Sequence, residues 1–264
     1  MRKYLSFFKI GLQLPFIYRS KVWLRAVRHT VVALTFIVFW SAVLKGSADF
    51  SGFTLSTLIT YYALVEIIDT LYTQTPGRVL AKDINSGNLS SYLVKPINYW
   101  GYTFSYTAGQ QLAGNSLSFI FIIAAFLFFP SHLLLPTQSV NGLFFVLSLI
   151  ISFLLYFQIF FLVGSLTFFL SQTTFLRQGI NQIAGVLGGK WIPIILMPVA
   201  AQSIIIYLPF RFLYDGPLKI FQEKMIQQDI ILGLITGSFW LLFFMILGRY
   251  VWGKGIKKYE AYGH

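Results

Sequence analysis

The chain has 264 residues, of which 56% are apolar, 19% are aromatic and only 11% are charged. Soluble domains carry about 25% charged residues, so the composition excludes a soluble globule and indicates an all-α protein that crosses a membrane several times. The net charge of +12 is explained by basic residues beside membrane spans, and we expect no nucleic-acid partner. The absence of cysteine excludes disulfides and thiolate metal sites.

Residues 2–20 predict an amphipathic helix that lies along the membrane interface. Arg2, Ser6, Lys9 and Gln13 recur at helical spacing and form a polar stripe opposite aromatic and aliphatic side chains. A frayed start to the first span is the alternative interpretation.

Six transmembrane helices are expected within a single domain, 1–264. They cover residues 27–44, 53–75, 99–129, 142–170, 179–200 and 230–252. Fifteen of the 20 Lys and Arg residues fall on the segments that this arrangement places inside, and five fall on outer segments. Basic residues favour the cytoplasmic side, so both termini are expected there.

The polar segment 76–98 stands between the second and third spans. Thr75 and Pro76 are typical of a helix start, and Gly87 of a helix stop. The sequence therefore predicts a short amphipathic cytoplasmic helix. Its apolar stripe is Val79, Leu80 and Ile84, with Arg78, Lys82 and Asp83 facing elsewhere. Such an element can transmit force to the flanking spans, or it can simply rest on headgroups.

Four stretches carry a resemblance to a known family. The segment "AKDINSGNLSSYLVKPINY" (81–99) resembles the cytoplasmic loop of permease subunits of bacterial type-2 ABC exporters, which read A-x-D-I-x-S-G-x-L-x-x-x-L-x-K-P. The start "MRKYLSFFKIGLQ" and the end "KGIKKYEAYG" are similar to that family's termini. The segment "GGKWIPIILMPVAAQSIIIYLPF" (188–210) is similar to its outer re-entrant region.

The resemblance implies a permease in the bacterial inner membrane that exports an amphipathic, lipid-like, peptide or drug-like substrate. Two permeases, identical or different, would form a dimer among membrane lipids, and each would meet a cytosolic ATPase that binds ATP and Mg. The cytoplasmic helix would be the coupling helix that enters a groove of the ATPase. The residues carried over to this role are Arg78, Lys82, Asp83, Ile84, Ser86, Gly87, Lys95 and Pro96.

The chain itself lacks the phosphate-binding loop of an ATPase. In "AGVLGGKW" (184–191), Ala184 replaces the first glycine of that motif and Trp191 replaces its Ser or Thr. We therefore expect no catalytic residue and no cofactor in this chain, with hydrolysis in a separate subunit.

Two carboxylates, Glu66 and Asp69, fall within the second span. Ionisable groups at membrane depth face a bundle interior or water, so both are candidates for the substrate path. The alternative is a structural pair, such as Asp69 with Arg25 or Arg28.

The first half of the third span is polar. Its amides, Gln110, Gln111 and Asn115, are either further candidates for the substrate path or interhelical hydrogen-bonding groups.

Region 188–215 cannot be one straight helix, because Pro193, Pro198 and Pro209 remove backbone donors. A broken, re-entrant element near the outer leaflet is expected to form a lid. Lys190 and Arg211 are expected near the outer headgroups.

Two other functions remain as alternatives. A membrane-embedded lipid-modifying enzyme would need clustered acidic or histidine groups, and a proton-coupled secondary transporter would use Glu66. His29 is expected at the inner headgroups, and no metal site is predicted because no metal-ligand spacing is present.

Overall fold

The computed structural model describes residues 2–44, 52–72, 76–128, 136 and 139–259. No β-strand occurs in these ranges, so the all-α class predicted from composition is confirmed. The expected helix cap Thr75, the loop residues 45–51 and 129–135, and the tail 260–264 lie outside the described residues.

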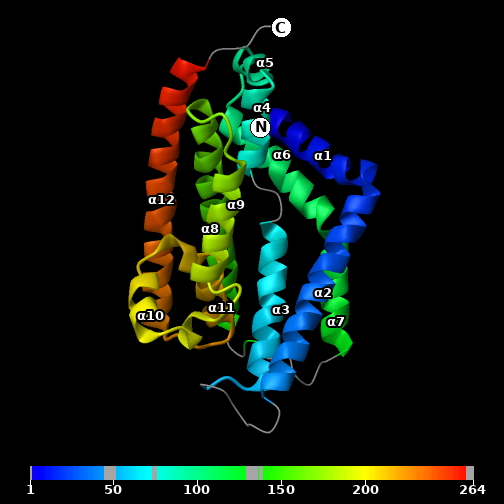
Figure 1. The fold of residues 1–264 in the computed structure, drawn as a ribbon, viewed down its shortest axis with the longest axis vertical. Coiled ribbons are helices and arrows are strands. Elements are labelled where there is room, and N and C mark those ends of the chain that lie inside the picture. Colours follow the sequence, from blue (N-terminus) through cyan, green and yellow to red (C-terminus); the bar gives the residue numbers. More distant parts are fainter. Residues whose placement is uncertain (1, 45–51, 73–75, 129–135, 137–138, 260–264) are drawn as a thin grey trace.

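The helices follow one another as α1 (Arg2–Ile17), α2 (Arg19–Val43), α3 (Leu55–Leu71), α4 (Pro76–Asn85), α5 (Leu89–Leu93), α6 (Tyr99–Gly114), α7 (Ser116–Phe128), α8 (Ser139–Ser165), η2 (Leu166–Phe168), α9 (Thr174–Leu187), η3 (Ile194–Leu196), α10 (Val199–Ile205), η4 (Pro209–Phe212), α11 (Asp215–Phe221) and α12 (Gln227–Lys258). Figure 1 shows α4, α5, the N-terminus and the end of α12 together at one end of the molecule. The last residues of α2 and the first residues of α3 lie at the opposite end, with α10 and α11 in that half.

Three of the described helices are long and apolar enough to cross a membrane, over Arg19–Val43, Val140–Phe168 and Gln227–Lys258. The other predicted spans are shorter or broken. α3 has 17 residues and α9 has 14, which correspond to about 25 Å and about 21 Å at 1.5 Å per residue.

The span predicted over 99–129 is two helices, α6 and α7, rather than one. Asn115 separates them with φ −113° and ψ 6°. Its amide donates to the carbonyl oxygens of Thr70 (2.6 Å) and Gln111 (3.1 Å). A short polar side chain that bonds nearby backbone competes with regular helix, which explains the break.

The main core gathers buried side chains of α3, α8 and the region of η4 and α11. Tyr72 stacks on Tyr156 with ring centroids 4.3 Å apart, and the edge of Tyr214 meets Tyr72 at 5.4 Å. The Tyr156 hydroxyl donates to the Tyr72 carbonyl at 2.6 Å. This core connects the second predicted span to the fourth.

The N-terminal helix α1 packs along α6 at a glycine crossing. A Cβ on Gly11 would overlap the carbonyl oxygen of Tyr106, and a Cβ on Gly109 would overlap that of Phe8. The polar stripe predicted on this helix faces outward, because Arg2, Ser6, Lys9 and Gln13 are all exposed.

Candidate functional site

The polar segment folds as two short helices at the end of the molecule that carries the start of α1 and the end of α12 (Figure 1). α4 begins at Pro76 as predicted, and Gly87 takes the left-handed conformation (φ 75°) that ends the helical turn. Leu80, Ile84 and Leu89 are buried in a cluster with aromatic residues of α6 and α8. The segment is therefore packed onto the helical bundle through these three side chains.

α4 crosses α8 at van der Waals distance between two glycines. A Cβ on Gly77 would overlap the carbonyl oxygen of Phe160 and would lie 3.1 Å from the nitrogen of Gly164. Both neighbours are backbone atoms, which cannot rotate away. α4 and α8 are therefore in direct backbone contact, with no side chain between them at this crossing.

Asp83 also faces the bundle, which corrects the expectation that it faces elsewhere. The Tyr99 hydroxyl donates to Oδ2 of Asp83 at 2.6 Å, and the carboxylate is buried. Burial raises the pKa of Asp83, while the hydrogen bond from Tyr99 and the charge of Lys82 act in the opposite direction. The aspartate therefore links α4 to α6 through a buried hydrogen bond, for which Tyr99 at the start of α6 supplies the donor.

The other residues that the family resemblance assigns to coupling differ in whether they face the bundle or the surface. Ile84 points inward with Asp83, whereas the exposed members are Arg78, Lys82, Ser86, Lys95 and Pro96. Val94, at the end of α5, is 83% exposed and is the most outward apolar residue of the segment. The segment thus has one face buried against the bundle and one exposed face.

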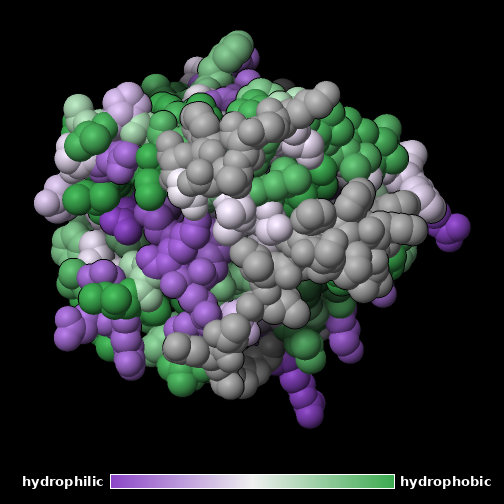
Figure 2. Space-filling model, turned by 90° about the horizontal axis from the view of Figure 1, so that it is seen from below, coloured by the Kyte–Doolittle hydropathy of each residue, from purple (hydrophilic) through white to green (hydrophobic). Residues whose placement is uncertain are grey.

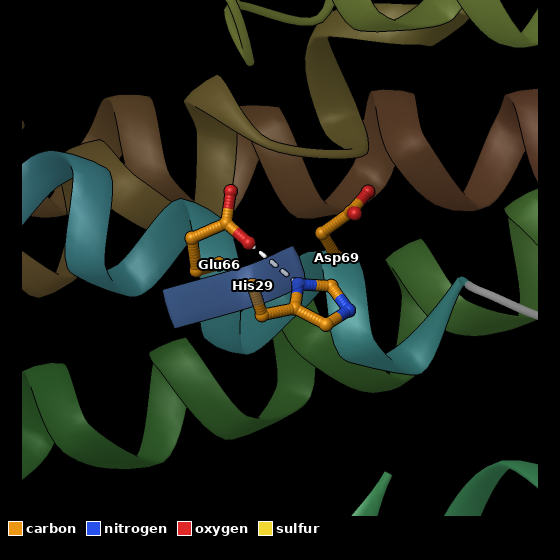
Figure 3. Close-up of side chains that lie close together, drawn as sticks. All are labelled: His29, Glu66 and Asp69. Carbon is orange, nitrogen blue, oxygen red and sulfur yellow. Dashed lines mark hydrogen bonds and ion pairs between the residues drawn. The ribbon is translucent and has the colours of Figure 1, made fainter. Parts of the chain in front are cut away.

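A buried ionic network links α2, α3 and the turn after α9 (Figure 3). Nδ1 of His29 lies 2.5 Å from Oε2 of Glu66, and its Nε2 lies 2.9 Å from a guanidinium nitrogen of Arg28. Nζ of Lys190 lies 2.7 Å from Oδ1 of Asp69, and Arg28 approaches the other oxygen at 3.9 Å. His29 and Glu66 are only 1% and 2% exposed.

Two expectations about this region are wrong. His29 is buried rather than at the headgroups, because Val22, Ala26 and His29 share the face of α2 that packs inward. Their spacing of four and three residues is a helical stripe that the sequence already contained. Lys190 contacts Asp69 instead of the outer headgroups, because α9 ends after 14 residues and turns Lys190 into the bundle. The proposed pairing of Asp69 with Arg28 is present at 3.9 Å.

His29, Glu66 and Asp69 place one potential metal ligand each within 4.8 Å of one another. Both ring nitrogens of His29 already have partners, and Lys190 holds Asp69. An entering metal ion would have to displace both Arg28 and Lys190. The arrangement is therefore a satisfied ion network, in which buried charges are paired as their burial requires.

A cavity of about 690 Å³, here called the α4-side cavity, opens beside this network. α2, α3, α4, α8 and α9 supply its walls. Its charged lining comprises Lys21, Arg25, Arg28, Arg78, Arg177 and Lys190, with Asp69 as the one carboxylate.

A second cavity, of about 600 Å³, is formed around α11, η4 and the start of α12. This α11-side cavity has a mixed charged lining of Arg211, Asp215, Lys219, Lys224 and Asp229. Figure 2 views the molecule from this end and shows hydrophilic surface enclosed by apolar patches.

The segment 188–193 lies between the two cavities, because Lys190 lines one and Pro193 lines the other. Hydroxyl groups of α3 hold it in place. Tyr61 donates to the carbonyl of Gly189 at 2.5 Å, and Tyr62 donates to that of Trp191 at 3.0 Å. Neither tyrosine was predicted as a site residue. The only signal in the sequence is that two tyrosines stand side by side within an apolar span.

The three third-span amides have protein partners and line neither cavity. Gln110 donates to the hydroxyl of Tyr106 at 3.1 Å, and Gln111 is buried. Asn115 bonds α3 through Thr70. The bond of Asn115 to Thr70 supports the interhelical hydrogen-bonding interpretation for Asn115, whereas the bond of Gln110 lies within α6.

The three prolines stand where short helices begin. Pro193 and Pro198 are the residues before η3 and α10, with φ −50° and −54°, and Pro209 opens η4. A proline lacks the N–H that a first turn leaves unbonded, so each marks a start at no cost in hydrogen bonds. Region 188–226 is accordingly a series of short helices.

The long apolar helices define the class of the molecule, a multi-pass helical membrane protein. A family model described as ABC-2 family transporter protein matches residues 30–263, so the chain belongs to this family. It is the membrane permease component of an ABC transporter, whose ATP hydrolysis resides in a separate ATPase subunit. No curated protein and no solved structure matches the chain.

Proposed function

We propose that this permease exports an amphipathic substrate, lipid-like, peptide or drug-like, from the cytoplasm or the inner leaflet. The observation that carries the proposal is the pair of cavities on either side of segment 188–193. A pump must open one site alternately to two sides. The bonds from Tyr61 and Tyr62 are few enough to break and re-form as the bundle rocks.

The polar segment would receive the force. Its exposed residues, above all Lys82 and Val94, dock on the ATPase, while the Gly77–Gly164 crossing and the Asp83–Tyr99 bond pass movement to α8 and α6. A coupling helix needs both faces, one for the motor and one for the bundle. ATP and Mg would bind to the ATPase alone.

The proposed topology places α4 and both termini in the cytoplasm of a bacterium and the α11-side cavity outside. The six spans are α2, α3, α6 with α7, α8, α9 and α12, and α1 lies at the interface. The helices that start at Pro193, Pro198 and Pro209 form the outer lid. A second permease chain, identical or different, completes the dimer among membrane lipids.

Within the bundle, Asp69 and Lys190 border the substrate path, and segment 188–193 closes it. Glu66 lies next to the path rather than in it, where its carboxylate bonds His29.

The natural absence of cysteine allows single-cysteine tests of this topology. In intact cells, a membrane-impermeant maleimide should label Gln228→Cys, at the exposed start of α12, and leave Val94→Cys unlabelled until the membrane is opened. Labelling of Val94→Cys from outside would refute the orientation and the coupling role together.

A photo-crosslinker attached to Val94→Cys should capture an ABC ATPase. The same reagent on Lys254→Cys, exposed on α12 at the same end, is the matched control. ATP-independent transport by the purified permease, or equal capture at both positions, would refute the proposal.

A further inference from the structure

The geometry points to the α4-side cavity as a binding site for a phosphate-bearing headgroup whose apolar tail lies along α2. This inference rests on the proposed function and adds to it the charge of the ligand. The amphipathic substrate would be an anion, held by its headgroup on the side of the bundle that carries α4.

The charge of the lining is the first support. Six basic side chains face one carboxylate, and Asp69 is already paired with Lys190 at 2.7 Å. Within the described ranges, none of the other five basic residues has an ion pair shorter than the 3.9 Å contact from Arg28 to Asp69. Like charges around a concave low-dielectric wall concentrate an anion of opposite sign.

Arg177 shows that strong protein contacts do not relieve this crowding. Its guanidinium group is held by only long contacts, to Gly77 (3.4 Å), Thr173 (3.4 Å) and Thr174 (3.2 Å). Guanidinium groups bind phosphate oxygens with paired donors, so a phosphate in the cavity would give Arg177 the short contacts that it lacks.

The shape of the cavity supports an amphipathic ligand rather than a free ion. A volume of about 690 Å³ falls in the range of about 300–1,000 Å³ typical of small-molecule sites. Leu24 lines the cavity and begins an exposed apolar ridge on α2 that continues through Val27, Val31 and Val38. Their spacing of three, four and seven residues keeps them on one helical face, where an acyl chain can lie.

The test measures binding of phosphatidic acid with short acyl chains to the full chain in phosphatidylcholine nanodiscs. We expect saturable binding that is weaker at high salt, and much weaker binding of a diacylglycerol with the same chains. Lys21→Gln/Arg78→Gln removes two exposed lining charges. At about 1 kcal/mol per charge, affinity should fall about 30-fold.

The matched control is Lys9→Gln/Lys254→Gln, which removes two exposed charges from the same end outside the cavity. The control should bind like the wild type. Equal affinity in the wild type and the cavity variant would overturn the proposal, and so would an equal loss in both variants, because a general surface potential would then explain the binding. Arg177→Gln provides a second lining variant if the first does not fold.

The bound phosphate can belong to a transported molecule or to a resident membrane lipid. Release of the bound phosphatidic acid during ATP turnover by the complete transporter identifies a transported ligand, and retention identifies a resident one. The binding measurement needs no ATPase, so its failure is separate from a failure of the proposed function. A complex that hydrolyses ATP and exports a neutral amphiphile, but binds no phosphatidic acid, would retain the function and remove this inference.

Discussion

Replacing Gly77 by alanine tests whether the close packing of α4 on α8 transmits force. The added Cβ meets three neighbours, the carbonyl oxygen of Phe160, the nitrogen of Gly164 at 3.1 Å and Cδ of Arg177 at 3.3 Å. The first two are backbone atoms. α4 therefore has to move away from α8 for the methyl group to fit.

The size of the effect follows from two opposing terms. Overpacking of this kind costs about 1–3 kcal/mol, and alanine gains about 0.5–1 kcal/mol over glycine within a helix. Gly179→Ala in α9 is the matched control, because no heavy atom lies within 4 Å of its added Cβ and it keeps only the gain. The two variants should differ by about 2 kcal/mol in stability.

The assay has two readouts. Thermal unfolding in detergent should show a lower midpoint for Gly77→Ala and an unchanged or higher one for Gly179→Ala. In vesicles with the partner ATPase, Gly77→Ala should hydrolyse ATP with less substrate moved per ATP. If both variants match in stability and in transport per ATP, the close crossing has no mechanical role and the reasoning is refuted.

Three further predictions concern the buried charges. Lys190→Met leaves Asp69 buried with only the long ion pair to Arg28, and it should lower the free energy of unfolding by about 3 kcal/mol. The double variant Lys190→Met/Asp69→Asn should recover stability, because it also removes the unpaired carboxylate. Failure of the double variant to recover in thermal unfolding would contradict the pairing. Burial raises the pKa of Asp83 in the folded protein, so the protonated carboxyl stabilises the fold. This stabilisation is complete below about pH 4 and is lost as the pH rises through the raised pKa. Asp83→Asn should remove this loss of stability with pH, and a pH profile of thermal unfolding identical to that of the wild type would refute the prediction. Glu66→Gln keeps an acceptor for His29, so ATP-driven transport should persist, whereas complete loss in a folded variant would favour proton coupling.

Local chemistry allowed the boundaries of the polar segment to be predicted. Pro76 starts α4, and Gly87 adopts the positive φ that ends the turn, because both residues restrict or extend backbone freedom regardless of their surroundings. The orientation of Asp83 could not be predicted in the same way. Its partner Tyr99 belongs to the next helix, and only the return of the chain creates the buried hydrogen bond.

The ionic network and the cavity depend on still more distant contacts. His29 and Glu66 are 37 residues apart, and neither residue carries a motif that names the other. The break at Asn115 was not predicted, because the bond of its side chain to the carbonyl of Thr70 joins residues 45 positions apart in the chain. Hydropathy reports how much of a segment avoids water, but not where one side chain bonds a neighbouring backbone.

Segment 188–193, between the two cavities, accepts the hydrogen bonds of both tyrosines at main-chain oxygens, those of Gly189 and Trp191. Every amino acid offers the same oxygen, so substitutions at positions 190 and 191 leave the acceptors of both phenols intact. In the proposed mechanism, the side chains at these positions can therefore differ without loss of the two hydrogen bonds that close the path. Relatives that keep both tyrosines but differ at these positions are then expected to move different substrates through the same closure.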